Sequence, residues 1–386
     1  MTKIKKVIYI IETRFNKRDY DRFGIEILKK NGFEVEVWDF TPFLGSHEYR
    51  RIEPPDPIKW DKLILFEEEK KALDALLGLD PSAYIVSLVP YTKRSFNLYK
   101  AIARKKTPYC VQGFALPRST TDTEIFKSRV KKFTFKKLAR KIVETNPLRY
   151  LSVTPADIIL TAGEKFNTVG SLVNRKSEVL WAHNFDYDAY LSIRDLHGAS
   201  DPKVGVFLDE YFPYHPDFVN VGVKWTMTHD EYYPLLCRFF DYLERKSGVK
   251  IIIAAHPRSH YEKHGDCFNG RKVIRGKTAQ LVKESGFVLI HHSTAINYAV
   301  LFNKPIIFMT TNKLDGAFIE DPSVAWLAKY FGKKAHNLDE PIDIDFNEEM
   351  KINARAYKNY KNDYIKKEGS PELPSWQILA ERLLNR

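Results

Sequence analysis

Residues 249–258 read VKIIIAAHPR, and this stretch decides the fold that we expect. Residues 249–255 form a short apolar run with the length of a strand that is buried on both faces. Pro257 then ends the strand, because proline fixes its own φ angle and has no backbone N–H to donate. A helical pattern over 230–246 precedes the strand and closes at Ser247-Gly248, a typical C-cap signal. A helix followed by a buried strand indicates a parallel sheet that is covered by helices.

The same alternation continues on both sides of this stretch. In the second half of the chain we predict further strands over 203–208, 287–290 and 305–309, and helices over 278–285 and 294–301. In the first half we predict strands over 7–11, 34–40, 84–89, 108–114 and 156–161, and helices over 19–30, 67–77 and 93–104. Strands separated by helices predict an α/β chain with two doubly wound, Rossmann-like domains that face a cleft.

A change in composition marks the boundary between the two domains. Polar residues lead into Gly198-Ala199-Ser200-Asp201-Pro202, a run that favours a connecting segment. We therefore expect an N-terminal domain over 1–190 and a C-terminal domain over 200–345. The charged segment 347–367 has the pattern of one long helix, so the tail 346–386 is expected to be helical and to pack back across the domains.

Composition narrows the class of protein. Hydrophobic residues make up 44% of the 386 residues, and no apolar run approaches the ~20 residues of a membrane-spanning helix. The N-terminus shows no secretory signal pattern, so we expect a cytoplasmic protein. The three cysteines have no CxxC spacing, which favours reduced thiols and no zinc site. A net charge of +12 implies an anionic partner: a nucleotide, a membrane surface, an acidic polymer or nucleic acid.

Two motifs of the second half follow strands and suit the binding of phosphate. His256, Pro257 and Arg258 stand at the carboxyl edge of the expected sheet, where an imidazole can donate to a phosphate oxygen and a guanidinium adds charge. The other motif lies between a buried strand and a helix and consists of His291, His292, Ser293 and Thr294. With Ser293 or Thr294 as N-cap, free backbone N–H groups and the helix dipole would attract an anion. The alternatives are a core or capping histidine at the first motif and simple helix capping at the second.

Carboxylates also lie at a predicted strand end. Asp209 and Glu210 follow strand 203–208, and either could be the general base that deprotonates an acceptor hydroxyl. The alternative is a loop acid paired with one of the many basic residues. A second acidic motif, Asp186-Tyr187-Asp188, matches the metal-binding Asp-x-Asp of single-Rossmann glycosyltransferases. No further ligands surround it in the sequence, so we predict a structural role without metal.

A run of Lys and Arg with interleaved Phe and Leu spans 127–141. Such a helix could attach the protein to the inner face of the cell membrane, close to a lipid-linked acceptor, or bind an acidic glycan. A solvated helix face is the simpler alternative. No Walker A loop, GxSxG, HExxH or GxGxxG motif is present, so no motif supports a hydrolase, an ATPase or a dehydrogenase.

The order of the motifs in the second half resembles bacterial sialyltransferases, including polysialyltransferases, lipooligosaccharide sialyltransferases and related capsule enzymes. Those enzymes carry an acidic pair, a His-Pro motif and a Ser/Thr pair, each at a strand end of one Rossmann-like unit. The matching residues are Asp209-Glu210, His256-Pro257 and Ser293-Thr294, and the resemblance covers residues 200–310. Tyr211 stands where the family has a glycine after its acidic pair.

The resemblance implies an inverting, metal-independent glycosyltransferase of GT-B fold. It would move an acidic sugar (sialic, another nonulosonic acid or Kdo-like) from a CMP-sugar to a glycan or glycolipid hydroxyl in capsule or lipopolysaccharide synthesis. The C-terminal domain would bind the donor and the N-terminal domain the acceptor. Asp209, or else Glu210, would take the proton of the acceptor hydroxyl. His256 would stabilise the departing CMP phosphate, with Ser293 and Thr294 as its binding residues. The expected donor set is completed by Pro257, Arg258, His291 and His292.

Other activities share the expected architecture. A UDP-sugar transferase or a UDP-sugar 2-epimerase would keep the fold and change the chemistry, and a CDP-polyol phosphotransferase would share the cytidine. A protein without enzymatic activity that binds anions or nucleic acid would also suit the positive charge. The sequence contains no nucleic-acid-binding motif, so we expect no nucleic-acid partner.

Overall fold

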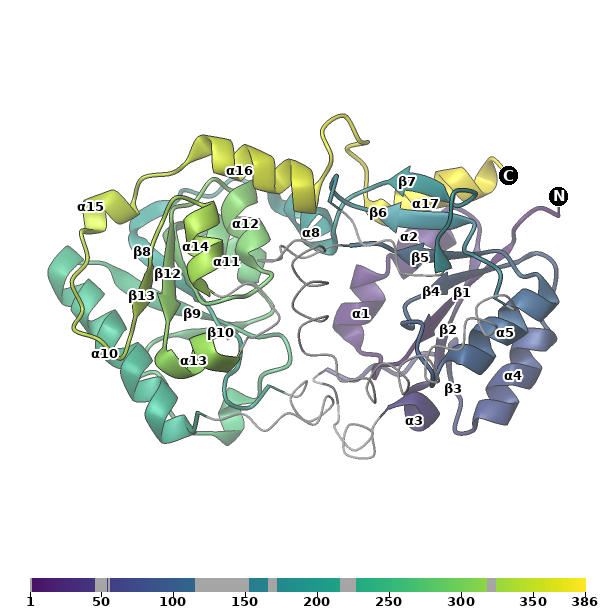
Figure 1. The fold of residues 1–386 in the computed structure, drawn as a ribbon, viewed down its shortest axis with the longest axis horizontal. Coiled ribbons are helices and arrows are strands. Elements are labelled where there is room, and N and C mark those ends of the chain that lie inside the picture. The colour runs from purple at the N-terminus through teal and green to yellow at the C-terminus, as the bar shows by residue number, and fades with distance from the viewer. Residues whose placement is uncertain are drawn as a thin grey trace, which may run out of the picture. The chain divides into compact units, whose positions relative to one another are not determined.

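The computed structural model describes residues 2–45, 54, 56–114, 153–165, 172–215, 227–317 and 324–386. These residues form two compact units (Figure 1). The first unit contains the described residues up to Ala182 together with Gly369–Arg386, and the second contains those from His183 to Glu368. The chain changes unit directly before His183, slightly earlier than the composition indicated, because α8 (Phe185–Ile193) packs against α11 and α12 of the second unit. The basic run 127–141 lies outside the described residues.

The first unit is built on a parallel sheet, for which seven strands are described. In chain order these are β1 (Lys6–Ile11), β2 (Glu34–Asp39), β3 (Leu63–Leu65), β4 (Ala83–Ser87), β5 (Tyr109–Gln112), β6 (Ile158–Thr161) and β7 (Glu178–Trp181). Their spatial order is β3-β2-β1-β4-β5-β6-β7. The order therefore reverses between β1 and β4, as in a Rossmann fold. Helices α4 (Glu69–Leu77) and α5 (Phe96–Lys105) contribute apolar residues to the core on one face of this sheet.

The second unit has a parallel sheet with six described strands. These are β8 (Asp201–Leu208), β9 (Lys250–Ala255), β10 (Val273–Arg275), β11 (Ser285–Ile290), β12 (Ile306–Thr310) and β13 (Ala335–Asn337). Their spatial order is β10-β9-β8-β11-β12-β13, and it reverses between β8 and β11. Helix α10 (His229–Ser247) buries one side in the core of one sheet face, with Tyr232, Phe239 and Phe240 fully covered.

Shorter helices complete the second unit. They are α11 (Thr278–Glu284), α12 (Ile296–Leu301), α13 (Asn312–Ala317), α14 (Val324–Tyr330) and α15 (Phe346–Glu349), with a 3-10 turn at Tyr261–Lys263. The predicted α/β class with two doubly wound, Rossmann-like units is thus confirmed by the strand order of both sheets. None of the helices within the described ranges is long and apolar enough to cross a membrane.

The strands that sequence patterns missed are the ones at the sheet edges. β3 and β7 border the first sheet, and β10 and β13 border the second. Each has only three or four residues, and three of them expose an apolar side chain, as Leu65 at 43% shows. An edge strand has a partner on one side only and can be very short, so it leaves too few residues in the sequence to be recognised as a strand.

The predicted helix over 19–30 is two helices, α1 (Lys17–Arg22) and α2 (Ile25–Lys30). Gly24 separates them in a left-handed conformation with a φ of 57°. A Cβ at this position would lie 2.3 Å from the Trp376 ring, so only glycine lets the indole approach. The Trp376 Nε1 donates to the carbonyl of Arg22, the last residue of α1, at 2.7 Å.

The tail is not one long helix. It forms the short helix α15, then α16 (Ala354–Tyr360), which continues into a π-helical turn over Lys361–Ile365. Helix α16 and this turn pack on the second unit. The last helix is α17 (Ser375–Leu384). Helix α17 packs on α2 of the first unit, and Arg382 forms a bidentate ion pair with Glu178 at 2.7 and 2.8 Å. Each unit is therefore completed by a different part of the tail.

Candidate functional site

The predicted motifs of the second half meet at the carboxyl edge of the second sheet. Strands β9, β8 and β11 are neighbours, and the switch point of the sheet lies between β8 and β11. Leu208 pairs with Ala254 and with Ile290, so the acidic pair lies level with the residues that follow both neighbouring strands. Ligands of doubly wound sheets bind at this place, where the loops from adjacent strands diverge.

Asp209 connects β8 with β9. One of its carboxylate oxygens accepts a hydrogen bond from the backbone N–H of His256 at 3.0 Å, and the other accepts from the N–H of Tyr211 at 2.9 Å. The side chain is only 3% exposed, and burial raises its pKa to about 6, against the opposing effect of the two N–H donors. Asp209 holds the His256 loop in place and offers little surface to a substrate, which fits a positioning role better than the expected role of base.

Glu210 makes the corresponding connection to β11. Its Oε1 accepts a hydrogen bond from the backbone N–H of His292 at 2.6 Å. Desolvation raises the pKa of Glu210 to about 8, and the negative charge of the nearby Asp209 adds to this increase. The side chain is partly exposed, so Glu210 is the acid of the pair that can reach a ligand. The raised pKa favours its protonated form, which can donate a hydrogen bond, whereas a general base would have to be ionised.

Tyr211 stands where the similar family has a glycine, and the structure shows how a tyrosine can take that place. Its φ of 59° lies in the left-handed region that glycine adopts without strain. Here a tyrosine holds that conformation because its side chain is anchored. The hydroxyl is 2.7 Å from Nε2 of His264, and the ring packs edge-on against Tyr261. The turn after the acidic pair thus has the geometry of a glycine turn, together with an aromatic side chain buried beside Asp209.

Three nitrogen-rich side chains gather at the end of β9. The ring of His256 lies edge-on to His215, with centroids 4.6 Å apart, and Nη2 of Arg258 is 3.4 Å from Nε2 of His215. The backbone N–H of Arg258 donates to Nδ1 of His256 at 3.2 Å, so the neutral His256 ring carries its proton on Nε2. All three residues are partly exposed. Arg258 donates to Nε2 of His215, because a guanidinium has no acceptor atom. The guanidinium and the Nε2–H of His256 are therefore N–H donors that suit an anionic oxygen.

His215 was not among the expected site residues. It lies in the loop that leaves β8, which the sequence marks only as a rigid, aromatic segment that could shape the acceptor side. Only its contact with His256 and Arg258 identifies it.

His291 was expected to bind the donor, and this prediction is wrong. The side chain is fully buried between β11 and α10. Nδ1 is 2.6 Å from the carbonyl of Met309, to which it donates, and Nε2 accepts from the hydroxyl of Tyr232 at 3.0 Å. Burial lowers the pKa of His291 to about 4, so it is a neutral core histidine at physiological pH. Both ring nitrogens are used inside the protein.

The Ser-Thr pair also differs from the expected arrangement. Helix α12 begins at Ile296 with Ala295 as its N-cap residue, so neither Ser293 nor Thr294 caps it. The hydroxyl of Ser293 accepts from the N–H of Ala295 at 3.3 Å, which closes a tight turn ahead of the helix. Ser293 is partly exposed and Thr294 is exposed at this sheet edge. Both remain beside Glu210 and His292 without the helix N-terminus that we had expected.

The acids of the Asp-x-Asp motif have structural partners. Asp186 accepts a hydrogen bond from the side-chain amide of Asn297 at 2.7 Å and thereby joins α8 to α12. Asp188 lies 3.7 Å from Nε2 of the buried His183. In the described part of the chain, no three His, Cys, Asp or Glu side chains are grouped as a metal ion would require.

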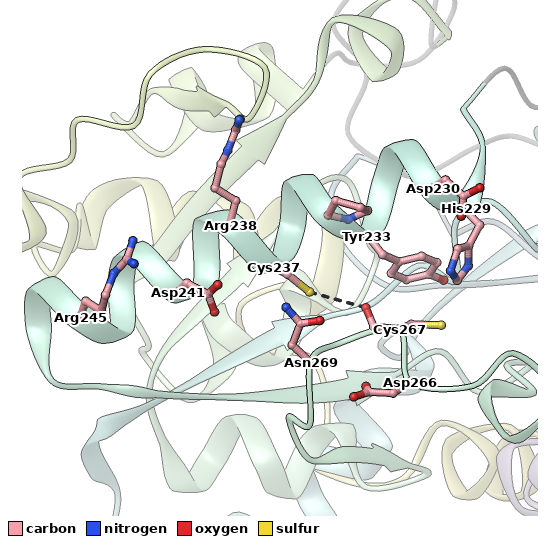
Figure 2. A pocket seen from close by; sticks show the side chains of 11 residues that line it. His229, Asp230, Tyr233, Cys237, Arg238, Asp241, Arg245, Asp266, Cys267 and Asn269 are labelled. Atoms are coloured by element: carbon pink, nitrogen blue, oxygen red, sulfur yellow. Dashed lines mark hydrogen bonds between the residues drawn. The ribbon is translucent and has the colours of Figure 1, made fainter.

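A separate cavity of about 490 Å³ lies along α10 and the loop before β10 (Figure 2). Its walls carry both signs of charge. The acidic residues are Asp230, Asp241 and Asp266, and the basic residues are Arg238 and Arg245. The thiol of Cys237 points toward the carbonyl of Cys267 at 3.6 Å. This cavity contains none of the strand-end residues described above, and its mixed charge does not favour an anion.

Comparisons with known proteins find similar chains among solved structures. No protein-family model matches the sequence, and no curated protein matches it significantly. Among solved structures, the calicheamicin glycosyltransferase CalG4 is 10% identical with a TM-score of 0.49, over 100% of this chain and 99% of the other. MurG of Acinetobacter baumannii is 10% identical with a TM-score of 0.46, over 99% and 100%. The UDP-GlcNAc 2-epimerase of Methanocaldococcus jannaschii is 13% identical with a TM-score of 0.44, over 98% of both chains. Similarity at this level says nothing about activity.

Proposed function

We propose that this protein is a glycosyltransferase that binds a nucleotide-activated sugar at the carboxyl edge of its second sheet. One observation carries the proposal: His215, His256 and Arg258 converge beside the acidic pair, next to the switch point of the sheet. The guanidinium of Arg258 and the imidazole of His256 supply N–H donors, and His215 accepts from Arg258 and thereby helps to hold it in place. A phosphate bridging a nucleoside and a sugar is the ligand that this donor set suits.

The chemistry of sugar transfer gives these groups a task. When the bond between the anomeric carbon and the phosphate oxygen breaks, its electron pair stays on the phosphate. Donors that are already oriented toward that oxygen stabilise the growing charge without reorganising. His256 is oriented by Asp209, through the hydrogen bond to its backbone N–H, and by the donor to its Nδ1. Its Nε2–H is therefore our candidate for the contact to the leaving phosphate.

Glu210 suits the same site in its protonated form. An ionised carboxylate beside a phosphate would repel it, whereas a neutral carboxyl can donate a hydrogen bond. The raised pKa of Glu210 favours this neutral form. We propose that Glu210 assists the departure of the nucleotide, and that Asp209 positions the His256 loop, in place of the base role expected for Asp209. Ser293 and Thr294 are proposed as further phosphate contacts.

The donor that we propose is a CMP-activated acidic sugar, transferred to a glycan or glycolipid hydroxyl without a metal ion. This finer assignment rests on the order of the acidic, His-Pro and Ser-Thr motifs along the chain. Attachment to a membrane surface through residues 127–141 stays a prediction, since these residues lie outside the described ranges.

Saturation-transfer NMR with CMP-, UDP- and CDP-activated sugars, in the presence of EDTA, tests the proposal. We expect selective signals from the cytidine and sugar protons of a CMP-sugar, which are lost in His256→Ala and Arg258→Ala. His260→Ala is the matched control, because His260 is close in sequence but pairs with Glu262 at 3.0 Å. Selective binding of UDP-sugars would replace the CMP assignment by a UDP-sugar activity, and absence of binding to every nucleotide would refute the site.

A further inference from the structure

The loop that leaves β8 carries a group of aromatic and histidine contacts directly before His215. Tyr211 and Tyr214 are the two ends of a tight turn, because the backbone N–H of Tyr214 donates to the carbonyl of Tyr211 at 2.8 Å. His264, in the loop after β9, contacts both ends of this turn. Its ring stacks on the ring of Tyr214, with centroids 3.8 Å apart and planes 3° from parallel, and its Nε2 is 2.7 Å from the hydroxyl of Tyr211. His264 therefore fixes the turn at two points.

Tyr214 has a second partner at the tip of its side chain. Its hydroxyl is 2.9 Å from Nδ1 of His229, the first residue of α10 (Figure 2). The Tyr214 ring is thus held across its face by His264 and at its hydroxyl by His229. These two histidines come from different segments of the chain, so two separate contacts fix the direction of one side chain.

The apolar anchor of the same loop is another residue. Phe212 is 4% exposed, belongs to the core of the second unit and lies edge-on to the ring of Tyr232. Burial of this ring attaches the loop to the sheet. Tyr214 is only half-buried at the margin of this core. Attachment of the loop therefore does not account for the two histidines that hold Tyr214.

The residue after Tyr214 belongs to the phosphate site, which consists of His215, His256 and Arg258. His215 accepts from Nη2 of Arg258 at 3.4 Å, and its ring lies edge-on to His256. A guanidinium on a long, partly exposed side chain has many rotamers, and a fixed acceptor selects among them. Consecutive Cα atoms are about 3.8 Å apart, so a displacement of Tyr214 would also displace His215 and take this acceptor from Arg258.

We propose that Tyr214 is a positioning residue of the phosphate site: His229 and His264 hold it so that His215 stays in place and orients the guanidinium of Arg258. Tyr214 itself does not touch the phosphate and acts through His215. Its role in sugar transfer rests on the proposed function. The contact between His215 and Arg258 can be measured without any nucleotide.

The first experiment is NMR of the histidine side chains on the full chain labelled with 15N, without nucleotide. His215→Gln identifies the Nε2 resonance of His215 by its loss, and Arg258→Ala shows how this resonance shifts when the hydrogen bond is removed. We expect Tyr214→Leu and His264→Leu to shift it in the same direction, because each removes one ring of the stack. Tyr214→Phe keeps the stacked ring and should retain most of the wild-type signal position. Circular dichroism confirms that each variant is folded.

Tyr357→Leu is the matched control. The Tyr357 hydroxyl also makes one hydrogen bond, to the carbonyl of Lys304 at 2.7 Å, and its ring also packs against one aromatic neighbour, Phe331, at 5.3 Å between centroids. Lys304 precedes β12, so this contact lies at the amino edge of the second sheet, opposite to the phosphate site. The control loses comparable contacts in the same unit, and we expect the His215 resonance to stay at its wild-type position.

Titration with CMP measures the consequence for binding. We expect Tyr214→Leu to weaken the Kd about tenfold, as for the loss of one hydrogen bond from a charged group, and Tyr357→Leu to leave it unchanged. The proposal is overturned if the folded Tyr214→Leu or His264→Leu variant keeps the wild-type resonance of His215, or if Tyr357→Leu shifts it as much. An unchanged Kd in Tyr214→Leu would also overturn it. Absence of CMP binding to the wild type would instead refute the proposed function, and the His215 resonance would still confirm or exclude the positioning of His215 by Tyr214.

Discussion

Replacing His291 by phenylalanine tests whether this histidine belongs to the core or to a binding site. The substitution keeps an aromatic ring of similar size but removes both hydrogen bonds of the imidazole. The carbonyl of Met309 and the hydroxyl of Tyr232 would then be buried without their partner. An orphaned buried group costs about 1 to 3 kcal/mol, and the larger apolar ring recovers part of it. We expect His291→Phe to lower the free energy of unfolding by about 2 to 4 kcal/mol at pH 7.

The pH dependence of this difference has a defined sign. The pKa of His291 is lowered to about 4 in the folded protein, from 6.5. Between these values the unfolded chain binds a proton that the folded protein does not, so wild-type stability is lost as the pH falls from 6.5 toward 4. At about 1.4 kcal/mol per unit, the wild type loses roughly 2 to 3 kcal/mol between pH 7 and pH 4.5 relative to the variant. At pH 4.5 the free energies of unfolding of the wild type and His291→Phe should therefore be almost equal.

Urea unfolding at pH 7 and pH 4.5, followed by circular dichroism, measures both quantities. Other titrating groups are common to the two proteins and cancel in the difference. His260→Phe is the control, because that histidine is partly exposed and its replacement should change the free energy of unfolding little at pH 7. A gap at pH 7 below about 1 kcal/mol, well under the cost of two orphaned groups, would refute the core assignment. So would a gap that widens on acidification.

Three further substitutions test other parts of the structure. Tyr211→Phe removes the 2.7 Å contact with His264 and should lower the free energy of unfolding by about 1 kcal/mol in urea titrations; an unchanged value would deny that this contact anchors the left-handed turn. Glu210 has a raised pKa, so it binds a proton in the folded state that the unfolded chain releases. Its contribution to stability therefore falls as the pH rises from 4.5 through 8. Melting temperatures at pH 5.5 and 8.5 should differ less in Glu210→Gln than in the wild type, and an equal or larger difference would contradict the shift. Trp376→Ala should cost about 3 to 5 kcal/mol by urea unfolding, because the fully buried indole fills the space beside Gly24; a cost below 1 kcal/mol would show that α17 is dispensable.

The central strands of both sheets could be predicted from the sequence because they are buried on both faces. Strands such as β9 and β11 must be mostly apolar, so each appears in the sequence as a recognisable run of apolar residues. The four edge strands have only three or four residues each, which is too short for a recognisable strand pattern. Gly24 had the appearance of a tolerated residue inside one helix, because the side chain that requires it, Trp376, lies more than three hundred residues further along the chain.

The candidate site was predictable to the level of the strand ends and no further. Parallel strands bring their carboxyl ends to one edge, so Asp209, His256 and His292 were expected to be neighbours before any coordinates were known. His291 and His292 could not be told apart, because the direction of each side chain depends on where the strand ends. The loop of His215 was noticed only as a rigid, aromatic segment, and the contact of His215 with His256 and Arg258 could not be predicted because these partners are distant in sequence.

The assignment of His256 to the departing phosphate is tested most directly by turnover. Release of free nucleotide from a CMP-sugar, with and without an acceptor glycan, would be followed for the wild type, His256→Ala and the control His260→Ala. We predict that His256→Ala lowers turnover at least ~100-fold while remaining folded, and that the control keeps the wild-type rate. Near-normal turnover in His256→Ala would contradict the account.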